Sequence, residues 1–146
     1  MYYTWTKISY WRNETASYWM GWHMTKIMVV DDDEDFTNLY KTTLKAAGYD
    51  ATAVNQSTAV IEMAYLVKPD IFVIDLMMPD VDGFQLCRML RADPSFKRTP
   101  IIIVTALTDE DSKLVALGAG ANDYLTKPFR VDELKSRINR LLTKVN

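Results

Sequence analysis

Short aliphatic runs alternate with helical patterns from Lys26 to the end of the chain, and this alternation constrains the fold more than any other feature. The aliphatic runs lie at residues 26–30, 49–54, 71–75, 101–105 and 123–127. The segments between and after them repeat apolar residues at three- and four-residue intervals, which is typical of helices with one buried face. Strands that alternate with helices pair in parallel. The sequence therefore predicts an α/β fold, a doubly wound sheet of five parallel strands with helices on both faces.

The expected helices end at recognisable stop signals. They cover about residues 36–47, 57–67, 84–93, 108–118 and 131–145. Gly48 and Gly118 follow the last periodic residues of two of them, and prolines follow two others. The acids at positions 109–111 stand where the dipole of a helix favours negative charge, as do Asp33, Glu34 and Asp35.

Composition changes abruptly near Met24, where we place a domain boundary. All four tryptophans and the only histidine, His23, precede Met24, whereas the remainder is rich in aliphatic and acidic residues. Residues 1–24 thus form an aromatic N-terminal extension with strand-like propensity that allows a short hairpin. Three interpretations stay open for it: a functional arm, a translation start placed too early, or an expression tag. Residues 25–146 are expected to form one domain.

Charge and hydropathy argue against several classes of protein. A net charge of -2 gives no general case for binding nucleic acid or an anionic membrane. The longest apolar runs are strand-sized, well short of the roughly 18 residues that span a membrane. Cys87, the single cysteine, cannot form an internal disulfide and is expected to be a small core residue. We therefore expect a cytoplasmic protein without direct contact with membranes or nucleic acid.

Polar residues gather where the predicted strands end. Asp31 and Asp32 follow the first strand, Asp75 ends the third, Thr105 the fourth and Lys127 the fifth. In an open parallel sheet, ligands bind beyond the carboxyl ends of the strands, where the strand order reverses. These side chains are therefore expected to meet at one edge of the sheet.

Such a group of side chains suits phosphoryl transfer. Clustered carboxylates repel one another and raise at least one pKa unless a cation neutralises them. Oxygen ligands of this kind fit Mg²⁺, which binds through a few carboxylates together with phosphate oxygens. Asp75 could then remain ionised as a nucleophile, while Lys127 and Thr105 supply a positive charge and a hydrogen-bond donor for phosphoryl oxygens.

Four stretches together resemble the receiver domain of two-component response regulators, over about residues 25–146. They are KIMVVDDDEDF, PDIFVIDLMMPDVDG, IIIVTA and GANDYLTKPF, in that order. The resemblance implies a CheY-like, flavodoxin-type sheet with strand order 2-1-3-4-5. It also implies a signalling switch that accepts a phosphoryl group on Asp75 from a sensor histidine kinase or a phosphotransfer protein. Beyond Mg²⁺-dependent self-phosphorylation and self-dephosphorylation, no enzymatic activity is expected.

The resemblance also assigns the surroundings of the phosphoacceptor. The ligands of Mg²⁺, or of Mn²⁺ in its place, would be the Asp75 carboxylate and the backbone carbonyl of Met77. Asp32 would bind the ion directly, and Asp31 would bind it mainly through water. Lys127 would pair with the phosphoryl group, and its peptide bond to Pro128 is expected to be cis.

Phosphorylation is expected to be read out through Thr105 and Tyr124. By resemblance, the Thr105 hydroxyl moves to the phosphoryl group and Tyr124 rotates inward, changing the surface of the fourth helix, fifth strand and last helix. The alternative is that Tyr124 packs at a strand edge with its hydroxyl in water. Partners of this surface would be a downstream protein, an output domain or a second phosphorylated copy. Met77 and Leu107 are apolar and cannot orient a hydrolytic water, so we predict a long-lived phosphoryl group.

Other functions stay open. A phosphatase with an aspartyl-phosphate intermediate usually carries a second acid two residues after its nucleophile, where this chain has Met77. A pseudo-receiver would bind partners without phosphorylation. The chain ends at Asn146, directly after the last predicted helix, which fits a stand-alone regulator or a receiver cut from a longer protein.

Overall fold

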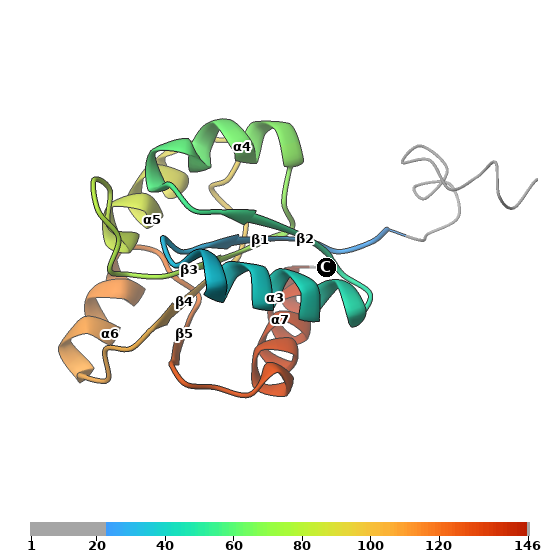
Figure 1. Ribbon diagram of the computed structural model, residues 1–146. Helices are drawn as coiled ribbons and strands as arrows, with labels where there is room; N and C mark the ends of the chain where they lie inside the picture. Colours follow the sequence, from blue (N-terminus) through green and yellow to red (C-terminus); the bar gives the residue numbers. More distant parts are fainter. Residues whose placement is uncertain (1–22, 146) are drawn as a thin grey trace, which may run out of the picture.

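The computed structural model describes residues 23–145 of the chain (Figure 1). Its elements are β1 (Lys26–Val30), α3 (Glu34–Ala46), β2 (Asp50–Val54), η1 (Ser57–Ala59), α4 (Val60–Val67), β3 (Ile71–Ile74), α5 (Gly83–Ala92), β4 (Ile101–Thr105), α6 (Glu110–Gly118), β5 (Asp123–Thr126) and α7 (Val131–Val145). The predicted strands and helices are all present, with ends that differ by a few residues. The second predicted helix begins as the 3₁₀ turn η1 before α4. All of the N-terminal extension before His23, with its three interpretations, lies outside the described residues.

The five strands form one parallel sheet in the order β2-β1-β3-β4-β5, as predicted. The last residue of β1, Val30, pairs with Val54 of β2 on one side and with Ile74 of β3 on the other. Ile74 pairs in turn with Ile103 of β4. The carboxyl ends of β1 and β3 are therefore neighbours in the centre of the sheet, and the residues that follow them lie side by side.

Two apolar layers cover the sheet. Figure 1 shows α4 and α5 on one side of the sheet and α3 and α7 on the other. Alternate residues of β1 divide between these layers: Met28 and Val30 belong to the first cluster, Ile27 and Val29 to the second. Because both faces are buried, the strands are continuously aliphatic instead of alternating with polar residues.

Aspartates begin three of the helices. Asp33, Asp82 and Asp109 are the N-cap residues of α3, α5 and α6, and each side chain accepts a hydrogen bond from the backbone amide three residues further on. Glu34 and Asp35 lie in the first turn of α3, where negative charge stabilises the helix dipole. The acids next to Asp31 and Asp32 are therefore helix-starting residues, as predicted.

Cys87 is a core residue of α5. It is fully buried in the cluster on the α4 and α5 side, and burial raises the pKa of its thiol to about 12. The prediction of a small core residue is thus confirmed. Among the described residues, no helix combines the length and apolarity needed to cross a membrane.

Candidate functional site

Three carboxylates converge at the centre of the sheet. Asp31, Asp32 and Asp75 each offer an oxygen atom, and these atoms lie within 4.8 Å of one another. The arrangement follows from the strand order, because Asp31 directly follows β1 and Asp75 directly follows β3. The Asp75 amide also donates to the Val30 carbonyl at 2.9 Å, which extends the pairing of the two strands to the site. Asp31 and Asp75 are buried, whereas Asp32 is exposed.

Burial and repulsion perturb the Asp75 carboxyl. Its pKa rises from 3.8 to about 6, first because burial removes water and second because Asp31 carries a negative charge nearby. Lys127 and a hydrogen bond with Thr105 act in the opposite direction without cancelling the effect. A cluster of carboxylate oxygens with an excess of negative charge fits a hard divalent cation such as Mg²⁺.

Lys127 lies between the carboxylates. Its Nζ is 2.6 Å from Oδ2 of Asp31 and 3.8 Å from Oδ1 of Asp75. The same ammonium group stands 3.8 Å above the centre of the Phe36 ring, in cation–π geometry. The bond from Lys127 to Pro128 is cis, as the resemblance implied. Lys127 therefore makes its short ion pair with Asp31, not with the predicted phosphoacceptor.

Thr105 and Tyr124 lie on neighbouring strands beside this cluster. Thr105 is buried at the end of β4, and its hydroxyl acts to lower the pKa of the Asp75 carboxyl. Tyr124 is buried in β5, and its hydroxyl donates to the backbone carbonyl of Leu107 at 2.7 Å. The alternative that placed the Tyr124 hydroxyl in water is therefore wrong. The coupled movement of Thr105 and Tyr124 stays a prediction.

Met77 and Leu107 differ in their surroundings. The Met77 side chain is 64% exposed in the loop after β3, whereas Leu107 is half-buried and packs against the core cluster. Met78, the next residue in this loop, is buried. The proposed influence of Met77 and Leu107 on phosphoryl lifetime stays a prediction, as does the metal-binding role of the Met77 carbonyl.

Two residues that hold the site were missed in the sequence. The side-chain amide of Asn55 donates to the Asp31 carbonyl at 2.9 Å and to the Thr37 hydroxyl at 2.7 Å. The Ser57 hydroxyl donates to the Pro79 carbonyl at 2.9 Å. The rule that pointed to the other strand ends applies equally to Asn55, because it directly follows β2.

Gly83 is a third such residue. A Cβ atom at this position would stand 2.5 Å from the backbone oxygen of Asp75 and 2.7 Å from the Cα of Leu76. Only glycine lets the first turn of α5 approach the main chain of Asp75 this closely.

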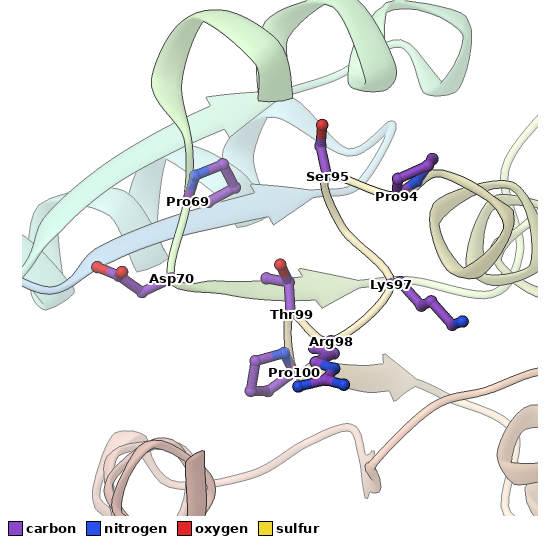
Figure 2. Close-up of a pocket in the computed structure, with 8 residues that line it drawn as sticks. All are labelled: Pro69, Asp70, Pro94, Ser95, Lys97, Arg98, Thr99 and Pro100. Atoms are coloured by element: carbon purple, nitrogen blue, oxygen red, sulfur yellow. The ribbon is translucent and has the colours of Figure 1, made fainter. Parts of the chain in front are cut away.

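A surface pocket lies at the other end of the sheet. Its volume is about 330 Å³, and it is lined by Pro69, Asp70, Pro94, Ser95, Lys97, Arg98, Thr99 and Pro100. Figure 2 shows these residues around the starts of β3 and β4. Because the acidic cluster lies beyond the carboxyl ends of the strands, this pocket is separate from the candidate site.

Comparison with known proteins gives one family. The response regulator receiver domain matches residues 27–139. The DNA-binding dual master transcriptional regulator RpaA of Synechocystis sp. is 37% identical over 123 residues, which cover 84% of this chain and 51% of RpaA. The chain thus spans about half the length of this curated relative.

Solved structures agree with this result. The receiver domain of the Francisella response regulator 1452 superposes with a TM-score of 0.77 at 36% identity, covering 84% of this chain and 99% of that domain. The Vibrio cholerae chemotaxis protein CheY4 gives a TM-score of 0.78 at 28% identity, covering 82% of this chain and 99% of CheY4. The predicted CheY-like fold is therefore confirmed.

Proposed function

Since the chain belongs to the receiver domain family of response regulators, we propose that Asp75 accepts a phosphoryl group from the phosphohistidine of a sensor histidine kinase or a phosphotransfer protein. The observation that carries this proposal is the position of Asp75, whose carboxylate shares one oxygen cluster with Asp31 and Asp32. Lys127 stands 3.8 Å from the same carboxylate, within reach of an incoming phosphoryl group.

The residues of the cluster would hold Mg²⁺ or Mn²⁺ together with the Met77 carbonyl. When bound, the ion would neutralise the negative charge of the carboxylates and the phosphoryl oxygens. Phosphoryl transfer depends mainly on such charge neutralisation and on positioning of the reacting groups. Asp75 acts as the nucleophile: its oxygen forms a bond to phosphorus as the bond from phosphorus to the donor imidazole breaks. Beyond this self-phosphorylation and the hydrolysis of the aspartyl phosphate by water, we propose no enzymatic activity.

Lys127 and Thr105 would stabilise the new group. Once Asp75 carries a phosphoryl group, strong acceptor oxygens compete with Asp31 for the Lys127 ammonium. The Thr105 hydroxyl, which helps to lower the pKa of the Asp75 carboxyl, can donate to the same oxygens. Lys127 would therefore exchange Asp31 for the phosphoryl group at the moment of phosphorylation.

The readout surface would comprise α6, β5 and α7. Tyr124 already points inward in the described structure, so a switch requires an outward position that the unphosphorylated protein also populates. The partner would be a downstream protein, a second copy or an output domain. RpaA is named as DNA-binding, so a DNA-binding output domain in a longer protein is one such candidate. That this chain itself avoids nucleic acid, and that it is cytoplasmic, stay predictions.

Intact mass spectrometry after incubation with Mg²⁺ and acetyl phosphate tests the proposal. The wild-type chain should gain one phosphoryl group, and Asp75→Ala should gain none. Asp32→Ala should raise the Mg²⁺ concentration needed for phosphorylation, because it removes a metal ligand. Its neighbour variant Asp33→Ala, which alters the cap of α3, should be phosphorylated normally. If the wild type takes up no phosphoryl group at Asp75, the chain is a phosphorylation-independent receiver.

The switch can be tested separately with a beryllofluoride mimic of the phosphoryl group. NMR spectra of the protein with Mg²⁺ and the mimic should show changed signals for Tyr124 and for the surface of α6, β5 and α7. Unchanged signals there would contradict the proposed readout.

A further inference from the structure

The loop between β3 and α5 contains a strained three-residue turn. Asp80 has a φ of 68°, which is in the left-handed region that residues with a side chain rarely adopt. The Val81 amide donates to the Pro79 carbonyl at 2.9 Å across this residue. A hydrogen bond between residues two apart around a positive central φ defines a γ-turn of the rare, strained kind. Such a turn persists only where its surroundings hold it.

Ser57 holds both ends of this turn. Its hydroxyl donates to the Pro79 carbonyl at 2.9 Å and accepts from the Val81 amide at 3.2 Å. A serine hydroxyl can donate one hydrogen bond and accept another at the same time. Here both hydrogen bonds go to the same turn. Ser57 is itself buried at the start of η1, in the segment that follows β2. Both of these hydrogen bonds are to main-chain atoms of the loop.

The loop that Ser57 holds carries Asp75 and Met77, the phosphoacceptor and a metal ligand of the proposed function. It starts at Asp75, passes through Met77 and closes where the Gly83 amide donates to the Leu76 carbonyl at 2.8 Å. The base of the loop is thus fixed by its own backbone, and its tip is fixed by Ser57. Met77 lies between these two attachments, so the position of its carbonyl depends on both.

We propose that Ser57 is a positioning residue for the divalent-cation site: it fixes the tip of the loop so that the Asp75 carboxylate and the Met77 carbonyl face the cation together. The inference rests on the proposed function in taking these groups as ligands. It adds a residue of η1, in the segment that follows β2, that controls the site without binding the cation itself.

Backbone-amide NMR titrations with Mg²⁺, on the full chain, test the proposal. Ser57→Ala removes both hydrogen bonds to the turn and should raise the dissociation constant for Mg²⁺ by about 2- to 10-fold, because only the part of their free energy that positions the metal ligands is lost from binding. It should also speed hydrogen exchange of the Val81 amide. Ser57→Thr keeps the hydroxyl and should restore the wild-type constant, and Ser57→Cys, with its weak hydrogen bonds, should give an intermediate value.

Ile138→Val serves as the matched control. Ile138 is fully buried in the cluster on the other face of the sheet, so this variant lowers stability without reaching the loop. Its dissociation constant for Mg²⁺ should equal that of the wild type. Equal weakening by Ile138→Val and Ser57→Ala would overturn the proposal, because general stability would then explain both.

Two further outcomes would also overturn it. One is an unchanged dissociation constant in Ser57→Ala together with faster exchange at Val81, since Ser57 would then hold the turn without serving the site. The other is a wild-type protein that binds no Mg²⁺. By contrast, a wild type that binds Mg²⁺ but takes no phosphoryl group from acetyl phosphate would refute the proposed function alone.

Discussion

Replacing Asp75 with asparagine should stabilise the metal-free protein at neutral pH. The Asp75 carboxyl is buried beside Asp31, and its pKa rises from 3.8 to about 6. At about 1.4 kcal/mol per pKa unit, the ionised form lowers the free energy of unfolding by about 3 kcal/mol compared with an unperturbed carboxyl. Asparagine has nearly the same shape and no charge, so Asp75→Asn should recover up to about 3 kcal/mol of this.

The sign of the effect fixes its pH dependence. Because the pKa of Asp75 is raised in the folded state, the native protein keeps the proton after the unfolded chain has lost it. The contribution of Asp75 to stability therefore falls as pH rises from 3.8 to about 6 and is fully unfavourable above that range. At about pH 3 and below, the carboxyl is protonated in both the folded and the unfolded protein, so the gain from Asp75→Asn should nearly vanish there.

Urea unfolding in the presence of EDTA measures this gain. Far-UV circular dichroism is the appropriate signal, because it follows the helices of the domain and residues 25–146 contain no tryptophan. Asp33→Asn, a change at the adjacent helix cap, controls for loss of an acid nearby. Saturating Mg²⁺ should narrow the difference, since it binds the wild type more tightly than Asp75→Asn. Equal stabilities at about pH 7.5, or a gain that does not change with pH, would refute the reasoning.

Three further predictions test other parts of the site and core. Gly83→Ala places a Cβ against the Asp75 backbone and should lower the free energy of unfolding, measured in urea, by about 1–3 kcal/mol. It should also slow phosphorylation by acetyl phosphate, and a variant as stable and reactive as the wild type would contradict this close approach. Cys87, buried with a thiol pKa of about 12, should resist iodoacetamide until urea unfolds the chain, as read by intact mass; rapid labelling of the native protein would be inconsistent with its burial. The double variant Met77→Asn, Leu107→Glu should lose its phosphoryl group several-fold faster than the wild type in a mass-spectrometric time course, because its polar side chains can orient water; an unchanged lifetime would remove the kinetic role of these residues.

The pattern of the chain alone was enough to predict the sheet and the composition of the acidic cluster. Burial on both faces makes a parallel strand continuously aliphatic, and each strand then ends where the chain meets water. The positions of Asp31 and Asp75 after two such strands therefore predict, from the sequence alone, that they lie at one edge of the sheet. The order of the strands came from the family resemblance, because periodicity does not say which strands are neighbours.

Tertiary structure alone decided which partners these side chains take. Lys127 and Asp31 are 96 residues apart in the sequence, and their ion pair depends on how β5 and β1 sit in the sheet. The hydrogen bond from the Tyr124 hydroxyl to the Leu107 carbonyl likewise joins separate elements. The same is true of the hydrogen bond from Ser57 to the Pro79 carbonyl beside the strained turn at Asp80. A residue type and its spacing determine what a side chain can bond, whereas packing determines which bonding group is within reach. The residue types at the strand ends thus define the chemistry available at the sheet edge, and the packing of separate elements defines how that chemistry is held.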